Sequence, residues 1–387
     1  MKIQKISVQD ARYLALYNQL LTADNKFKTR QDVLSIIEKL GYIQIDTISI
    51  IERAHKHVLW TRFPDFKNEM LDDLIDKEKK IFEFWDHSAA YLPMKYFRFS
   101  MNRKIRYAKK YREWAVKNKK IIKYVKDKIH SEGPKQSRDF EHPAKRGIWW
   151  DWKPTKDALE YLFHTGELMV KARKGFQKVY YLTERILPVS TDTSTPSPEE
   201  LSEHLILKSI NAGGIVSISE MTYLRHHDPK ATSSVINMMT EKKEIIPVKI
   251  HRAKEEYFTT PNILKQLNNK QPEKQIHILS PFDNLVIQRK RLKNLFGFDY
   301  VIECYLPSHK RKFGYFCLPL LYGDEFIGRL DAKADRKTGK FRIINIFWES
   351  SMNKKKRLIL YSLIEKKLLQ LAKFSGCSEI YIPENTY

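Results

Sequence analysis

The sequence predicts an α+β fold built from several packed units, and three observations lead to this expectation. The chain has 387 residues, enough for two or three domains of about 100 to 200 residues each. The hydrophobic fraction is 42% and the charged fraction is 30%, as in folded globular proteins rather than disordered chains. Apolar residues recur at helical spacing up to about residue 265, with short alternating segments between them, and alternating segments dominate after Lys274.

The first elements can be read from apolar spacing and helix-end signals. An opening helix is predicted from about Val8 to Tyr17, and a second helix is predicted after Thr29, which serves as its N-cap, with Gly41 at its end. From Tyr42 to Ile48 apolar and polar residues alternate, which is typical of a strand. Gln44 and Asp46 are two residues apart in this segment, so an extended chain places both on one side.

Two later stretches share one order of elements, three helices followed by a two-stranded hairpin, which is typical of a winged helix. We therefore expect tandem winged-helix modules followed by a small β-barrel-like C-terminal domain. The expected divisions are 1–118 (a modified N-terminal copy), 119–188 (a second winged helix), 189–200 (a Ser-, Thr- and Pro-rich linker), 201–265 (a third winged helix) and 270–387 (β-rich). In the last division, strands are expected at 276–279, 300–306, 314–321, 325–333, 340–348 and 379–382, with a helix over 354–374.

The charge indicates a polyanionic partner. Lys and Arg number 70 against 46 Asp and Glu, for a formal net charge of +24. Lysines and arginines that neutralise phosphates release counterions, which favours nucleic acid, whereas a lysine-rich overall composition is the alternative source of the charge. The sequence has no apolar run of about 18 residues and its start has no apolar signal core, so we expect no membrane partner and a cytoplasmic location. The three cysteines are widely scattered and predict neither disulfides nor a zinc site.

Few segments carry recognisable chemistry. A Gly-rich phosphate loop, a His-Glu metal signature and a nucleophile elbow are all missing from the sequence, which removes local support for nucleotide hydrolysis, metalloproteases and serine hydrolases. A polar pair, Gln44 and Asp46, remains among isoleucines. Taken alone, such a pair is as often structural as catalytic.

Several blocks together resemble a known family. The segment from Tyr42 to Ile48, with Arg53, Ala54 and His55 after it, resembles the Gln-apolar-Asp motif of the AlkX (YcaQ) branch of the AlkZ-type winged-helix DNA glycosylases, whose AlkZ branch has Gln in place of the Asp. Further blocks of this family occur in family order and span nearly the whole chain: Phe82 to Ala89, Trp149 to Pro154, Thr165 to Met169, Ser280 to Leu285 and Gly328 to Arg336.

The resemblance implies a monofunctional DNA glycosylase that hydrolyses the N-glycosidic bond of N7- or N3-alkylated purines in duplex DNA, and it also implies unhooking of interstrand crosslinks. Asp46 would stabilise the developing positive charge on the sugar and accept a proton from water, while Gln44 would hold that water. No lysine nucleophile, metal or cofactor is expected. We expect a nucleoid-associated monomer.

Further candidate residues follow from their positions in the sequence. Substrate-pocket candidates, for which a structural role is an open alternative, are Arg53, His55, His57, Trp85 and His87. Candidates for binding DNA phosphate are Lys171, Arg173, Lys174 and Lys178 on the first predicted hairpin, and Arg289, Lys290, Arg291, Lys310, Arg311 and Lys312. The tryptophans Trp149, Trp150 and Trp152 are expected to pack rather than to stack on a base.

Two other functions fit the same charge and element order. A non-catalytic winged-helix transcriptional regulator would bind one DNA sequence far better than bulk DNA and would leave Asp46 without a role. An RNA-binding or translation-associated factor would prefer single strands, and no aromatic RNA-binding motif supports it.

Overall fold

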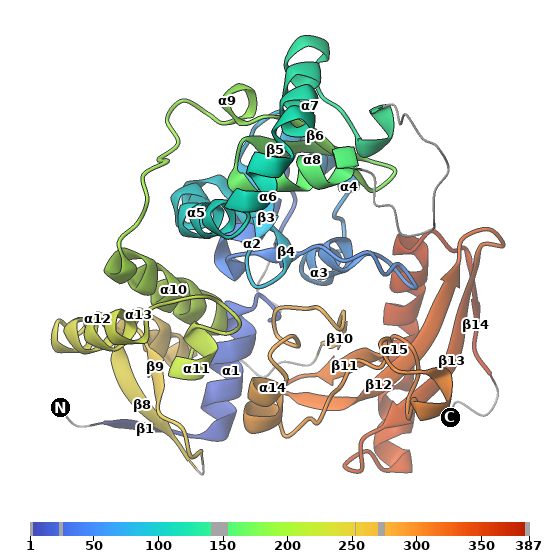
Figure 1. The fold of residues 1–387 in the computed structure, drawn as a ribbon. Coiled ribbons are helices and arrows are strands. Elements are labelled where there is room, and N and C mark those ends of the chain that lie inside the picture. Colours follow the sequence, from blue (N-terminus) through green and yellow to red (C-terminus); the bar gives the residue numbers. More distant parts are fainter. Residues whose placement is uncertain (1–2, 23–25, 141–153, 252, 270–274, 384–387) are drawn as a thin grey trace. The chain divides into compact units, whose positions relative to one another are not determined.

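The chain folds into two compact units in a computed structural model (Figure 1). The structure describes residues 3–22, 26–140, 154–251, 253–269 and 275–383. The first unit contains residues 1–66, 87–89 and 202–387, and the second unit contains 67–86 and 90–201. The tryptophans predicted to pack at 149, 150 and 152 lie outside the described residues.

The first unit opens with β1 (Gln4–Ile6), α1 (Val8–Asn18) and α2 (Arg30–Leu40). The Thr29 side chain accepts a hydrogen bond from the backbone N–H of Asp32, and the Asp32 side chain accepts one from the backbone N–H of Thr29, which is a capping box. Gly41 ends α2 with φ 77°, a left-handed conformation that favours glycine. Both opening helices, and the predicted end signals of the second, are confirmed.

A small sheet in the first unit joins the N-terminus to a distant hairpin. The hairpin is β8 (Ile246–Ile250) with β9 (Tyr257–Thr259), and it follows α10 (Pro198–Gly213), β7 (Val216–Ser217), α11 (Ile218–Met221) and α12 (Pro229–Glu241). The strand order is β1-β8-β9-β7, with β1 parallel to β8. The helices and the hairpin were predicted, but the pairing of β1 with β8 was not. After β9 come α13 (Pro261–Leu264) and the 3-10 helix η3 (Lys265–Asn269).

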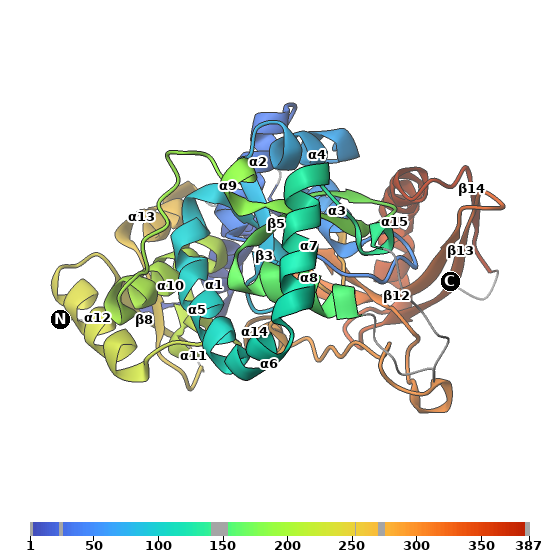
Figure 2. The ribbon, with the colours of Figure 1, turned by 45° about the horizontal axis from the view of Figure 1, so that its top comes forward.

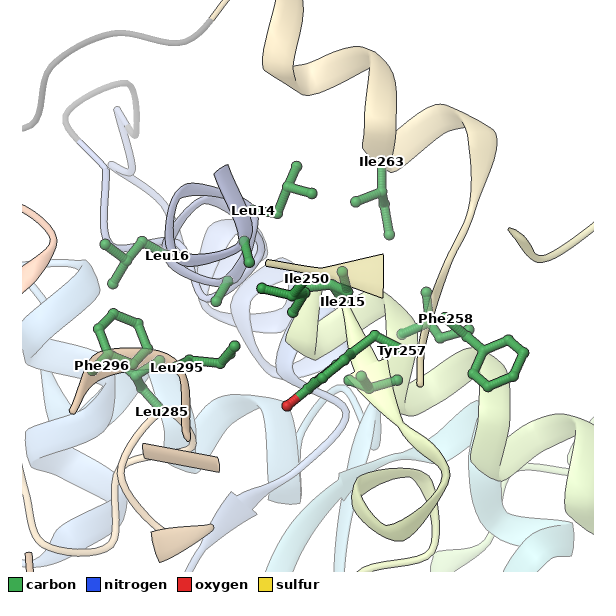
Figure 3. Packing of buried hydrophobic residues seen from close by; sticks show 14 of the residues in the cluster. Leu14, Leu16, Ile215, Ile250, Tyr257, Phe258, Ile263, Leu285, Leu295 and Phe296 are labelled. Carbon is green, nitrogen blue, oxygen red and sulfur yellow. The ribbon is translucent and has the colours of Figure 1, made fainter. Parts of the chain in front are cut away.

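A hydrophobic core holds this region together (Figure 3). Leu14 and Leu16 of α1, Ile250 of β8, Tyr257 of β9 and Leu295 of α14 (Arg289–Phe296) are buried in one cluster. Burial of apolar surface stabilises a fold by roughly 25 cal/mol for each Å². The first helix is therefore fixed by segments more than 200 residues later in the sequence.

The C-terminal part of the first unit is a curled half-barrel sheet covered by a helix (Figure 1). The strands are β10 (Ile276–Ile278), β11 (Leu318–Tyr322), β12 (Glu325–Asp335), β13 (Lys340–Trp348) and β14 (Glu379–Tyr381), in this order across the sheet. The first three pairings are antiparallel, and β14 joins β13 in parallel. The predicted helix is confirmed as α15 (Lys354–Phe374), whose apolar face lies in the same buried cluster as the sheet.

Two predictions for this part are wrong in detail. No strand forms over 300–306, where the Tyr300 ring is buried and its hydroxyl donates to the carbonyl of Cys317 at 2.6 Å. The strand predicted from Gly314 begins only at Leu318. The backbone N–H groups of Lys312, Phe313 and Gly314 donate to the Glu303 carboxylate, so these donors are not available to a strand partner.

The second unit contains helices, two short strands and a long hairpin (Figure 2). Its first elements are α4 (Asn68–Asp76), β3 (Ile81–Trp85), β4 (Ala89–Pro93), which starts at the unit boundary, and the 3-10 helix η1 (Met94–Ser100). They are followed by α5 (Met101–Lys110), α6 (Arg112–Lys117), α7 (Lys119–Glu132), η2 (Ser137–Asp139) and α8 (Pro154–Thr165). The hairpin is β5 (Leu168–Lys174) with β6 (Gln177–Leu182), followed by α9 (Thr183–Ile186). Helix α8 packs against α5, α7 and the hairpin, and the helices and hairpin predicted between residues 119 and 182 are confirmed.

No helix within the described ranges is both long enough and apolar enough to cross a membrane.

Candidate active site

The Gln44–Asp46 motif lies directly after the Gly41 turn in the first unit. Strand β2 contains only Ile43 and Gln44, and the backbone N–H of Ile45 donates to the carbonyl of Ala89 at 2.8 Å. The side chains of Ile43 and Ile45 are buried and fix the segment in the core. The predicted strand to Ile48 is wrong beyond Gln44, because the Asp46 carboxylate accepts a hydrogen bond from the N–H of Ile48 at 2.7 Å. Short polar side chains that bind their own backbone in this way favour turns over strands.

Asp46 has the environment of a tuned carboxylate. It is half-buried, and burial raises its pKa above the ordinary value. The N–H of Ile48 and the positive charge of Arg53 act in the opposite direction without cancelling this effect. A carboxylate with a raised pKa is a stronger proton acceptor in its ionised form than an exposed one.

Gln44 is buried and contacts His87. Its Oε1 lies 3.2 Å from His87 Nε2, so the imidazole donates to the amide carbonyl when the proton is on Nε2. The His87 ring lies between two tyrosines, with ring centroids 4.9 Å from Tyr42 and 5.9 Å from Tyr223. The structure thus brings His87 to Gln44. The contact uses the carbonyl oxygen of the Gln44 amide and not its NH₂ group.

The other predicted pocket residues of the first unit differ in their surroundings. Arg53 precedes α3 (Ala54–Arg62), donates to the carbonyl of Thr47 at 2.9 Å and lies close enough to Asp46 to affect its pKa. His55 and His57 are both buried in α3. The Nε2 of His57 lies 2.9 Å from the carbonyl oxygen of Ile278, and burial lowers the His57 pKa to about 4. His55 and His57 are thus held inside α3, and their predicted contact with the substrate stays a prediction.

Trp85 belongs to the second unit, and its assignment to the substrate pocket stays a prediction. Its side chain is 39% exposed, with the Arg103 guanidinium 5.0 Å from the ring centroid. An exposed Trp that is stacked with a cation is not a core residue.

Residues distant in the sequence also reach the motif. Burial is the main cause that raises the pKa of the Cys304 thiol, and the negative charge of Asp46 raises it further. The Asp46 charge also contributes to the raised pKa of Tyr305, whose ring is 76% exposed. Neither residue was identified from the sequence, and neither was Tyr223, because nothing in a single sequence links positions about 180 to 260 residues apart. Tyr42, by contrast, could have been found from its place next to the motif.

Three of the predicted DNA-binding arginines are used inside the fold. Arg173 forms two hydrogen bonds of 2.7 Å to the buried Glu83 carboxylate. Arg289 donates to the carbonyls of Val286 and Pro281. Arg291 is buried, where it pairs with Glu220 and donates to the carbonyls of Gly213 and Ile215. These guanidinium groups have partners within the protein, and the predicted phosphate contact of the three arginines stays a prediction.

The remaining predicted cations stay candidates. Lys174, Lys310 and Lys312 are exposed, and Arg311 is half-buried. Lys171 lies 3.7 Å from Asp76, Lys178 pairs with Glu160, and Lys290 pairs with Glu255. The Lys178–Glu160 pair is partly buried, whereas Lys171 and Lys290 are more exposed, and exposed ion pairs are typically worth 0 to about 1 kcal/mol, so a phosphate can displace the carboxylate there.

No cluster of His, Cys, Asp or Glu side chains suited to a metal ion occurs within the part of the chain that the structure describes.

Comparison with known proteins defines the class. A family model described as "DNA glycosylase AlkZ-like" matches residues 37–374, so the class of protein is a DNA glycosylase. The chain belongs to the AlkZ-like DNA glycosylase family, which confirms the resemblance drawn from the motifs. The structure is similar to that of the Streptomyces sahachiroi DNA glycosylase AlkZ, with a TM-score of 0.65 and 14% identity over 98% of this chain and 100% of the other. At this identity the similarity shows the shared mixed α+β fold.

Proposed function

We propose that this protein is a monofunctional DNA glycosylase that hydrolyses the N-glycosidic bond of N7- or N3-alkylated purines in duplex DNA, with Gln44 and Asp46 as its catalytic residues. The observation that carries the proposal is the half-buried Asp46 carboxylate of raised pKa, which lies two residues after a buried Gln44 whose amide is held by His87. Membership of a DNA glycosylase family supplies the reaction class.

The chemistry of the substrate fits this pair. Alkylation at N7 or N3 makes the purine cationic, so it leaves with the electrons of the glycosidic bond without strong protonation by an acid. The sugar becomes positively charged as the bond breaks, and a carboxylate stabilises that charge. Water then adds to the anomeric carbon and loses a proton to Asp46, which acts as general base. Gln44 holds this water by donating from its amide NH₂, because its carbonyl faces His87.

The proposal also covers the lyase step, interstrand crosslinks and the winged-helix modules. Water is the nucleophile and no lysine takes part, so no lyase step follows. Unhooking of an interstrand crosslink would use the same bond cleavage at an alkylated purine. We propose that 119–188 and 201–265 are winged helices, that 1–118 is a modified copy, and that the protein acts as a monomer on chromosomal DNA in the cytoplasm. Lys171, Lys174, Lys178, Lys290, Lys310, Arg311 and Lys312 are the proposed phosphate contacts.

A direct test uses a duplex oligonucleotide with a single N7-alkylguanine. After incubation with the full chain, alkali should cleave the strand at the resulting abasic site, and an otherwise identical unmodified duplex should stay intact. Binding should depend strongly on salt and little on sequence. Lack of excision across several N7 and N3 adducts, together with tight binding to one sequence, would instead favour a transcriptional regulator.

His87 is expected to position Gln44 rather than to react. His87→Ala should lower kcat for excision roughly tenfold, in line with the loss of one oriented hydrogen bond, and leave KM for DNA nearly unchanged. His87→Gln should recover much of the rate because its amide donates to Gln44 Oε1. Single-turnover kinetics measure both effects, with His251→Ala as the exposed-histidine control. Equal losses in kcat for the Ala and Gln variants would contradict this role.

A further inference from the structure

A hollow of about 460 Å³ lies beside the C-terminal sheet of the first unit. Its walls come from three places: Ile50 after the Gln44–Asp46 segment, the loop from Ser308 to Phe316, and the strand residues Asp331 to Lys333 and Ile344. Sites for small organic ligands typically measure about 300 to 1,000 Å³. The hollow is therefore large enough for a nucleotide-sized ligand, and Asp46 is not among its lining residues.

The carboxylate of Asp331 lines this hollow without a hydrogen-bond donor. Asp331 is half-buried at a β-bulge in β12, and among the described residues no side chain or backbone N–H donates to it. Gly314 makes room for it, because a Cβ at that position would lie 2.3 Å from Asp331 Oδ2. The Asp331 oxygens are therefore available to hydrogen-bond donors of a ligand in the hollow.

The loop beside Asp331 is held by internal contacts. Glu303 is 8% exposed and accepts hydrogen bonds from the N–H groups of Lys312 at 3.2 Å, Phe313 at 2.9 Å and Gly314 at 3.1 Å. The Phe313 ring packs edge-on to Phe347 with centroids 5.2 Å apart, and the Arg329 guanidinium lies 4.1 Å from the Phe313 centroid. These contacts favour one shape of the loop, and such preorganisation lowers the entropy lost on binding.

Cations and an aromatic ring complete the lining. Arg311, Lys312 and Lys333 all line the hollow, and with Asp331 they give three positive charges against one negative charge. The Arg311 guanidinium lies 4.8 Å from the centroid of Tyr315, which is 37% exposed. The ligand should accordingly combine an anionic group, a flat face for stacking and an edge with hydrogen-bond donors.

We propose that this hollow is a second nucleotide-binding site that takes an unpaired guanine nucleotide, with the base edge on the Asp331 carboxylate and the phosphate on Arg311, Lys312 and Lys333. Guanine has two adjacent donors on its Watson–Crick edge, N1–H and the N2 amino group, which match the two oxygens of a carboxylate. Adenine and cytosine present one donor group beside an acceptor, and thymine presents one donor between two acceptors, so each of them places an acceptor against the carboxylate. The guanine nucleotide is either a free mononucleotide or an unpaired nucleotide of a DNA strand. Only the second case rests on the proposed function.

Binding of nucleoside monophosphates to the full chain tests the site. In isothermal titration calorimetry, dGMP should bind at least about tenfold more tightly than dIMP. dIMP lacks the N2 amino group and so loses one charge-assisted hydrogen bond. dAMP should bind more weakly than dIMP. Asp331→Asn should remove the preference for dGMP over dIMP, while Asp299→Asn, an exposed carboxylate paired with Lys293, should keep it. Thermal unfolding of each variant checks that it is folded.

The pH dependence supplies a second measurement. Burial raises the Asp331 pKa to about 6, the Glu303 charge adds to this, and the nearby Arg311 opposes it, with Lys312 and Lys333 as the other charged groups of the lining. The ionised carboxylate is needed, so the ratio of dGMP affinity to dIMP affinity should rise as the pH increases through about 6. Both ligands carry the same phosphate, so its own titration cancels in this ratio.

The outcomes separate this site from the glycosylase reaction. Asp46→Asn should bind dGMP as the wild type does, since Asp46 does not line the hollow. Two single-stranded oligonucleotides that differ only in one dG or dI identify the source of the ligand. If a nucleotide within a strand reaches the site, the dG oligonucleotide should bind more tightly than the dI oligonucleotide. If only free dGMP binds more tightly than dIMP, the ligand is the mononucleotide. Equal binding of dGMP, dIMP and dAMP to the wild type, or an unchanged preference in Asp331→Asn, would overturn the proposal whether or not excision occurs.

Discussion

Asp46→Asn is expected to lower the rate of excision of an N7-alkylguanine about a hundredfold or more. Without the carboxylate, the protein loses both the group that stabilises the positive charge on the sugar and the general base. The asparagine side chain is nearly the same size, and its Oδ1 still accepts a hydrogen bond from the N–H of Ile48. The turn after β2 should therefore persist, and DNA affinity should change little. Single-turnover excision and equilibrium binding to an undamaged duplex measure the two quantities separately.

The stability of the same variant provides its control. Folding raises the Asp46 pKa, so the folded state holds the proton more tightly than the unfolded state, and ionisation above that pKa lowers the free energy of unfolding. Removing the charge should then leave the protein as stable as the wild type, or more stable, at neutral pH. An inactive Asp46→Asn that is also destabilised and has lost DNA binding would point to a structural role and contradict the catalytic assignment.

Asp283→Asn is expected to lower the free energy of unfolding by about 3 to 5 kcal/mol, which is typical when one partner of a buried ion pair is removed. Arg62 Nη1 lies 2.6 Å from Asp283 Oδ2 and Nη2 lies 3.0 Å from Oδ1, with both side chains fully buried. The change leaves the Arg62 charge in the interior without its counter-ion. It also weakens the acceptor for the backbone N–H of Leu285, which lies 2.9 Å from Oδ1.

Urea unfolding measures this loss. Asp299→Asn breaks an exposed pair with Lys293, where both side chains are more than 60% exposed, and should change the free energy of unfolding by no more than about 1 kcal/mol. The double variant Arg62→Met with Asp283→Leu should recover much of the stability, because no unpaired charge remains. If Asp283→Asn lowers the free energy of unfolding no more than Asp299→Asn does, the interior accommodates the unpaired Arg62 and the prediction is wrong.

Local signals in the sequence predicted the helices well. The N-cap Thr29 and the C-terminal Gly41 act within one turn of α2, and the 21 residues of α15 follow a long helical pattern. Strands were predicted less well, because their partners lie far away in the chain. The alternation from 42 to 48 is interrupted by the Asp46 side chain, and the segment at 300–306 gives no strand because Tyr300 and Glu303 bond to residues 312–317 instead.

The candidate site was accessible to sequence analysis only where one short motif contains it. Gln44 and Asp46 were identified by the family motif, and His87 lies in a second block that the fold brings to Gln44. The cations were harder to assign, because a sequence does not distinguish a phosphate-binding arginine from one that binds a carbonyl. Arg289 binds backbone carbonyls, Arg173 binds the Glu83 carboxylate and Arg291 binds both kinds of group, while Lys174 is exposed on the same hairpin as Arg173.

The parallel pairing of Gln4–Ile6 with Val248–Ile250 ties the start of the chain to a segment made much later on the ribosome. Until residue 250 has emerged, the opening strand has no edge to join, and the apolar face of α1 lacks the hairpin that buries it. Closing so long a loop is slow, and the exposed segment must avoid aggregation in the meantime. The segment from Gln4 to Asn18 is thus unsuited to expression as a separate fragment, and its packing is completed at a late stage of biosynthesis.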